Sequence, residues 1–191
     1  MKILKYYFCI FLFFLLNTAC SNLAVNEMTK YDTQHLAKGA ISYKVSNTWV
    51  KEAVSNSMRL EQYKIADNSN LSVSFLPGNA GGLDANIERW KNQFSQDAAF
   101  KILENTQFNY RSIPVTKIYL NGNYLESQDP FNPSAQKLLR KNWAAYIIVA
   151  ETEPGTWFFK ALGPASELKR EENNLDDFMR SFAIKRETSE H

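Results

Sequence analysis

The C-terminal half of the chain contains two apolar runs joined by a short turn. The first run, Trp143–Ala150, reads WAAYIIVA, and the second, Trp157–Leu162, reads WFFKAL. Between them, Glu153-Pro154-Gly155-Thr156 is typical of a tight turn. A strand without a polar side has no face to turn toward water, so residues 143–150 are predicted to form a central strand covered on both faces. The two runs therefore predict an antiparallel hairpin with a layer of structure on each side.

Alternating polar and apolar side chains predict further strands before this hairpin. They are expected at Ala40–Val45, Met58–Ala66, Leu71–Phe75, Thr106–Tyr110 and Val115–Leu120. The pair Asn121-Gly122 is typical of two-residue hairpin turns and is expected to lead the chain into Tyr124-Leu125. Ser127–Lys141, which is polar and contains two prolines, is predicted to be a loop.

Two segments have the apolar periodicity of helices. In Leu83–Ser95, the side chains of Leu83, Ile87, Trp90 and Phe94 form one apolar stripe. A final amphipathic helix, after the stop at Gly163-Pro164, is indicated by Leu175, Phe178, Met179 and Phe182. Helices separated by antiparallel hairpins predict an α+β fold, with an antiparallel β-sheet flanked by helices. We expect one such domain over residues 40–185, followed by a frayed, charged tail at residues 186–191.

The N-terminus has the pattern of a lipoprotein signal peptide. Lys2 and Lys5 precede the apolar run Tyr6–Leu16, which is too short to cross a hydrocarbon core that needs roughly 20 apolar residues. The run ends in Leu16-Asn17-Thr18-Ala19-Cys20, small residues before a cysteine as in a lipobox, although Asn17 departs from the usual aliphatic residue. We expect cleavage after residue 19 and lipidation of Cys20. Residues 20–39, polar and without periodicity, are then expected to be a flexible tether.

Removal of this segment changes the charge and the thiol content of the chain. The formal charge of +2 comes from 22 basic and 20 acidic residues, and Lys2 and Lys5 leave with the signal, so the mature chain is neutral. A neutral domain lacks the basic surface that nucleic acid binding requires, so nucleic acid is not an expected partner. The two cysteines are Cys9 and Cys20, so no free thiol is expected after cleavage and lipidation. Membrane attachment is expected through the acyl chains on Cys20.

The expected domain lacks the residues of common catalytic sites. The two histidines, His35 and His191, fall in the expected tether and at the terminus, so we predict no catalytic residue, no metal site and no cofactor. Gly78–Gly82 has neither the Walker pattern nor the dinucleotide-binding spacing. Its glycines favour a sharp turn into the helix, although a helix N-terminus can also attract an anion.

The helix at residues 83–95 also has a polar and aromatic ridge beside its apolar stripe. The ridge consists of Asn86, Arg89, Trp90 and Gln93, at offsets of zero, three, four and seven. Lys160 is a charged residue within the apolar strand 157–162 and is expected to face the same region. Two interpretations stay open: the side chains attach the helix to the sheet through hydrogen bonds, or they line a site for a ligand or partner.

Three stretches together resemble an uncharacterised group of secreted bacterial lipoproteins. They are Met58-Arg59, the helix sequence GGLDANIERWKNQF at residues 81–94, and FFKALGP at residues 158–164. The shared signature is Gly-Gly, Asn, Arg-Trp and Gln-Phe on a helix, with a later Phe-Lys and Gly-Pro. In outline this group is similar to PsbP-like domains, whose α/β/α sandwich the resemblance implies here. PsbP-like domains are binding and assembly modules, and the resemblance implies the same role.

These observations favour a non-catalytic, lipid-anchored envelope protein that binds a protein or a small ligand. Two alternatives stay open: a carrier of a small apolar ligand, which needs an enclosed cavity, and a carboxylate-based envelope hydrolase, which needs converging ionisable groups. Ser21 follows the cysteine where an aspartate is usual for retention at an inner membrane. In a cell with two membranes we therefore expect the outer membrane, facing the periplasm.

Overall fold

The computed structural model describes residues 31–35, 41–129, 132 and 134–184. Its main element is a seven-stranded antiparallel sheet in the order β3-β4-β5-β9-β8-β7-β6. The strands are β3 (Val50–Glu52), β4 (Glu61–Ala66), β5 (Ser69–Pro77), β6 (Lys101–Tyr110), β7 (Ile113–Ser127), β8 (Lys137–Thr152) and β9 (Gly155–Pro164).

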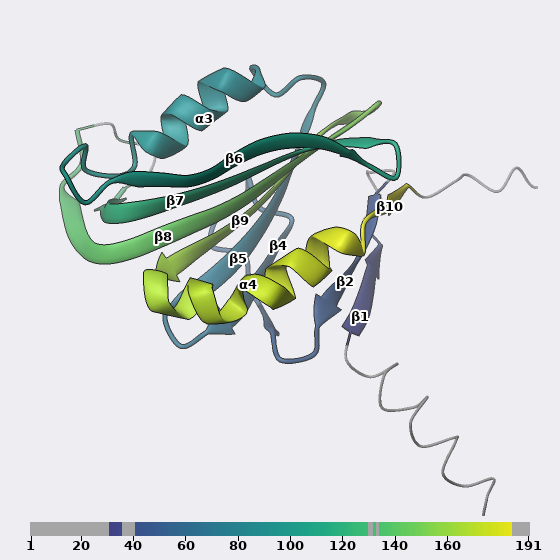
Figure 1. Cartoon of the computed structure of the whole chain (residues 1–191), viewed down its shortest axis with the longest axis horizontal. Helices are drawn as coiled ribbons and strands as arrows, with labels where there is room; N and C mark the ends of the chain where they lie inside the picture. The colour runs from purple at the N-terminus through teal and green to yellow at the C-terminus, as the bar shows by residue number, and fades with distance from the viewer. Residues whose placement is uncertain (1–30, 36–40, 130–131, 133, 185–191) are drawn as a thin grey trace, which may run out of the picture.

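The hairpin of β8 and β9 lies inside this sheet, as the sequence predicts. Alternate residues of β8 belong to two different apolar cores: Tyr146 and Ile148 to one, Ile147 and Val149 to the other. Each core is covered by one helix, with α3 (Leu83–Lys91) on one face and α4 (Ala165–Arg180) on the opposite face (Figure 1). The run 143–150 therefore needs no polar side, and the α+β prediction is confirmed.

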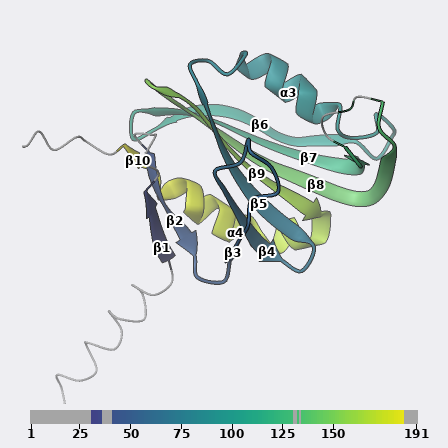
Figure 2. The same ribbon diagram turned by 180° about the vertical axis from the view of Figure 1, so that it is seen from behind.

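A small second sheet lies beside α4. It consists of β1 (Tyr31–His35), β2 (Ile41–Ser46) and β10 (Ala183–Ile184), with β2 in the middle, and it is visible near the two ends of the ribbon in Figure 2. Tyr43 of β2 contacts Phe159 and Phe178, which joins this sheet to the α4 core.

Strand β1 corrects the expected tether. His35 pairs with Ser42 through the backbone, so residues 31–35 belong to the fold, and His35 is not in a free linker. A free edge of β2 offers backbone donors and acceptors, and an extended segment satisfies them without needing an apolar side. The remaining residues of the expected tether lie outside the described residues.

The predicted turn at Asn121-Gly122 is wrong. Strand β7 runs through both residues with a shift of register between Gly122 and Tyr124. A Cβ at Gly122 would lie 3.1 Å from the Cα of Phe100, so the glycine serves a close backbone approach rather than a reversal. The chain reverses instead at Arg111 and Ser112, which both have positive φ.

Several boundaries also differ from the predictions: β4 begins at Glu61 rather than Met58, and β6 begins at Lys101 rather than Thr106. Residues 137–141, expected in a loop, begin β8 and pair with the end of β7. Helix α3 ends at Lys91, and the backbone N–H groups of Gln93 and Phe94 then close tighter turns onto Trp90 and Lys91. These turns bring Phe94 into the core, where it forms a β-bridge with Tyr124.

Candidate functional site

The candidate site lies on the face of the sheet that carries α3. Lys160 lies between Phe158 and Leu162 on β9, and both of these contribute to the core under α3. Since alternate residues of a strand share a face, the Lys160 side chain points to the α3 side. Lys160 thus faces the helix ridge, as predicted from its place in an apolar strand.

A row of directly opposed residues crosses the sheet through Lys160. Gln62 of β4 lies opposite Ser72 of β5, Ser72 lies opposite Lys160, and Lys160 lies opposite Ile147 of β8. Opposed residues of antiparallel strands lie on the same face. Lys160 therefore marks the border between the apolar part of this face, which α3 covers, and a polar strip on β4 and β5. The strip consists of Gln62, Lys64, Asn70, Ser72 and Ser74, all half-buried or exposed.

Asn86 holds the start of α3 in place. Its Nδ2 donates hydrogen bonds to the carbonyl oxygens of Ala80, at 2.9 Å, and Gly82, at 2.8 Å. Its Oδ1 accepts a hydrogen bond from Arg89 at 2.9 Å. Asn86 is buried, and both its amide nitrogen and its amide oxygen form hydrogen bonds. It therefore fits the interpretation that the ridge side chains have a structural role.

Trp90 is part of the core. It is 3% exposed and packs edge-on against Phe158, with ring centroids 5.7 Å apart. Its outer ring face supports the exposed Arg89, whose guanidinium carbon lies 5.5 Å from the ring centroid. Trp90 therefore attaches the helix and positions the arginine, and it does not itself present a binding surface.

Gln93 and Lys160 are in direct contact. The Lys160 ammonium donates a hydrogen bond to Oε1 of Gln93 and lies 5.7 Å from the ring centroid of Tyr124. Tyr124 in turn stacks on Trp143, with the rings 9° from parallel. Gln93 reaches this place because α3 has ended, so helical spacing alone does not explain its position.

Arg59 completes the site, although it was not predicted as a site residue. It lies in the turn before β4 and donates a hydrogen bond to Oε1 of Gln62. Burial, and then the charges of Arg89 and Arg59, lower the pKa of Lys160 to about 7. No local pattern marks Arg59 as a neighbour of Lys160, because only the pairing of β4, β5 and β9 brings the two together. We call Arg59, Arg89 and Lys160 the cation cluster.

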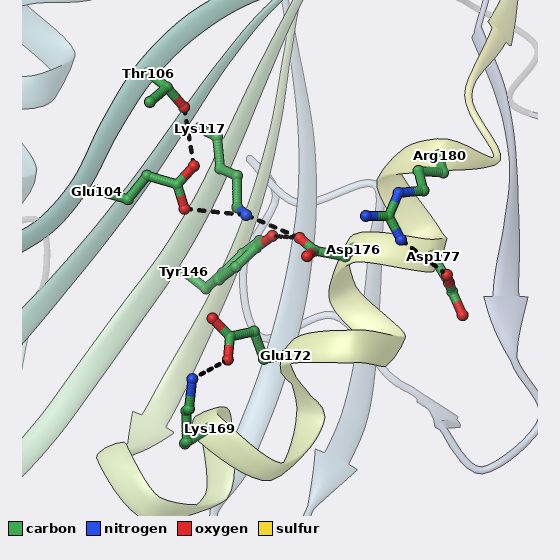
Figure 3. Close-up of polar contacts among 9 residues, drawn as sticks. All are labelled: Glu104, Thr106, Lys117, Tyr146, Lys169, Glu172, Asp176, Asp177 and Arg180. Atoms are coloured by element: carbon green, nitrogen blue, oxygen red, sulfur yellow. Dashed lines mark hydrogen bonds and ion pairs between the residues drawn. The ribbon is translucent and has the colours of Figure 1, made fainter.

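Lys117, on the other face of the sheet, is surrounded by carboxylates rather than by cations. Its ammonium lies 3.0 Å from Glu104 of β6 and 2.9 Å from Asp176 of α4, as Figure 3 shows. The hydroxyl of Tyr146 donates to the same carboxylate of Asp176. Burial acts to lower the pKa of Lys117, but these two carboxylates outweigh it and raise the pKa above its ordinary value. The Lys117 network therefore attaches α4 to the sheet as a compensated ion network.

The described residues show neither a metal site nor a membrane-spanning helix. They contain no group of three or more His, Cys, Asp or Glu side chains arranged to hold a metal ion. Neither α3 nor α4, the helices of this part, is long and apolar enough to cross a bilayer. Cys20, the expected lipidation site, lies outside the described residues.

Comparison with known proteins identifies the fold but no relative in sequence. No family model matches the chain, and no curated protein matches it. The solution structure of cyanobacterial PsbP (CyanoP) from Synechocystis sp. PCC 6803 superposes with a TM-score of 0.56 at 11% identity, covering 82% of this chain and 93% of that one.

Two further solved structures are similar at lower scores. A crystal structure from Bacteroides thetaiotaomicron VPI-5482 has a TM-score of 0.45 at 8% identity, covering 80% of this chain and 47% of that one. A protein of unknown function from Pseudomonas aeruginosa has a TM-score of 0.42 at 11% identity, covering 83% of this chain and 99% of that one. The similarity to CyanoP supports the expected outline: the chain has a PsbP-like α+β fold.

Proposed function

We propose that this protein is a non-catalytic binding or assembly module, held at an envelope membrane by lipid on Cys20 and facing the periplasm. Its ligand or partner binds at the cation cluster beside α3. The observation that carries the proposal is the kind of hydrogen-bond partner that each cation of the cluster has. Arg59, Arg89 and Lys160 donate to Gln62, Asn86 and Gln93, so each cation has a neutral amide oxygen as its partner.

The PsbP-like fold supports a binding role in the way the sequence resemblance does, since such domains are binding and assembly modules. The pKa of Asp176 in the Lys117 network is a second argument for a binding role rather than catalysis. A carboxylate-based hydrolase needs a carboxylic acid with a raised pKa to protonate its leaving group. Burial acts to raise the pKa of Asp176, but hydrogen bonds from Tyr146 and Lys117 outweigh it and lower that pKa. Asp176 therefore holds Lys117 as a carboxylate rather than offering a proton.

The test is photo-crosslinking of the full-length protein in membranes of its native host. Arg89→Ala removes one cation of the cluster. Lys91→Ala removes a cation of the same helix that already pairs with Glu88 at 2.6 Å, and serves as the matched control. The proposal expects Arg89→Ala to lose cross-linked species that the wild type and Lys91→Ala retain. Identical cross-links in all three, with folding verified by circular dichroism, would remove the cluster as the binding surface.

A further inference from the structure

The cation cluster concentrates positive charge without a carboxylate to balance it. Among the described residues, no ion pair involves Arg59, Arg89 or Lys160, whereas Lys51, Lys91, Lys117 and Lys169 each pair with a carboxylate. The carboxylate of Glu52 lies at the end of the polar strip, but it accepts from Nε2 of Gln62 at 3.2 Å. The charged and titratable groups facing Lys160 are thus Arg89 from α3, Arg59 from the turn before β4, and Tyr124 from β7.

Among the described residues, hydrogen bonds occupy only some of the donors of the cluster. An ammonium has three N–H donors and a guanidinium has five. Lys160 uses one for Gln93, Arg89 one for Asn86 and Arg59 one for Gln62. These amides and the Trp90 and Tyr124 rings hold the cations in place, so the geometry exists before a ligand arrives.

We propose that the cation cluster binds a phosphate group, with Lys160 beneath it as a point charge and the guanidinium groups of Arg59 and Arg89 at its sides. The proposal deepens the proposed function by naming the chemistry of the ligand at the same site. Three cations suit a phosphate, which carries about −1.5 to −2 charges near pH 7, better than a carboxylate with one charge. Guanidinium forks match the oxygen geometry of phosphate, and a lysine acts beside them as a compact charge.

The proton on Lys160 makes the site dependent on pH. Burial and the two arginines lower the pKa of Lys160 to about 7. A bound phosphate supplies the missing negative charge and favours the protonated lysine. Affinity is therefore expected to fall as the pH rises from 6 to 9, because the free protein then has to take up a proton on binding.

Isothermal titration of the full-length protein in detergent tests the proposal, with inorganic phosphate and glycerol phosphate as probes. Binding to vesicles with and without phosphatidic acid separates a lipid headgroup from a free phosphate as the source. Lys160→Met and Arg89→Ala are each expected to weaken binding about tenfold or more. Lys64→Ala, which removes an exposed lysine of the same sheet face, is expected to leave affinity within about twofold.

Two controls make the outcomes distinct. Lys160→Met is expected to melt at a higher temperature than the wild type, so a loss of binding cannot reflect a loss of fold. Phosphate or vesicle binding that depends on Lys160 supports the proposal. Absence of binding to every probe, or binding that Lys160→Met leaves unchanged, overturns it. If no phosphate probe binds while Arg89→Ala still loses its cross-linked species, the proposed ligand chemistry is wrong, but the proposed binding role is supported.

Discussion

Lys117 and Lys160 are lysines on opposite faces of one sheet, and the charges around them differ. Lys117 contacts two carboxylates, and its side chain is 13% exposed. Lys160 contacts an amide and an aromatic ring, and the charged groups that act on it are two arginines. A charge removed from water without an opposite charge costs free energy, so the two residues are expected to affect stability in opposite directions.

Replacing each lysine by methionine tests this difference. Lys160→Met removes an uncompensated charge and is expected to raise the free energy of unfolding at pH 6 by about 1–3 kcal/mol. Lys117→Met leaves Glu104 and Asp176 without their cation and is expected to lower it by about 1–2 kcal/mol. Urea unfolding monitored by circular dichroism measures both. A destabilised Lys160→Met protein would contradict the description of Lys160.

The stabilising effect of Lys160→Met is expected to depend on pH. The pKa of Lys160 lies at about 7 in the folded protein and is lowered relative to the unfolded chain. The wild type therefore bears the full cost of the charge below pH 7 and progressively less of it as the pH rises toward 10. The gain from Lys160→Met should accordingly shrink between pH 6 and pH 9. A gain that stays constant over this range would show that Lys160 titrates normally.

At the level of elements, α3 depends on a polar anchor as well as on its apolar stripe. Asn86→Ala removes the hydrogen bonds to Ala80 and Gly82, so we expect a loss of about 1–2 kcal/mol in the free energy of unfolding. Asn92→Ala is the matched control, because Asn92 follows the same helix with an exposed side chain and is expected to change stability by less than about 0.5 kcal/mol. Equal effects in thermal melts would mean that Asn86 is no anchor.

The hairpin of β6 and β7 allows a second test at this level. Arg111 and Ser112 have φ of 50° and 68°, a backbone that Asn and Gly adopt with less strain. The double change Arg111→Asn with Ser112→Gly is therefore expected to stabilise the protein by about 0.5–1 kcal/mol. Gly122→Ala forces a Cβ toward the Phe100 backbone and is expected to destabilise it by about 1–2 kcal/mol. The reverse pattern in chemical denaturation would place the turn at residues 121–122.

Helix α3 and the hairpin of β6 and β7 show which parts of the fold can be predicted from the sequence. Burial patterns decide the central hairpin and both helices, because apolar side chains must face a core whatever the connections are. The turn between β6 and β7 is missed because Arg111-Ser112 is not a typical turn sequence. Asn121-Gly122 is one, but there the glycine allows a close approach to the backbone of Phe100. Arg59 is missed for a different reason: its proximity to Lys160 follows from pairing across β4, β5 and β9, which no local pattern encodes.

For the whole molecule, the proposed lipid anchor concerns residues outside the described part of the chain. Cys20→Ser removes the sulfur that accepts the acyl chains, and the full-length protein should then move from the membrane fraction to the soluble fraction or stay unprocessed. Fractionation followed by mass spectrometry of the N-terminal peptide measures this. Membrane attachment of a processed Cys20→Ser chain, or a wild-type peptide without lipid mass, would contradict the anchor.

The sheet brings Lys160 to the border of the α3 core, where no carboxylate of the described residues forms an ion pair with it. The most direct test is the titration of the Lys160 ammonium by NMR, with selective ¹³C labelling of lysine and Lys160→Met for assignment. We predict a midpoint near pH 7 in the free protein and a higher midpoint in the presence of phosphate. A midpoint near 10.4, the value of an unperturbed lysine at about 25 °C, would contradict the account.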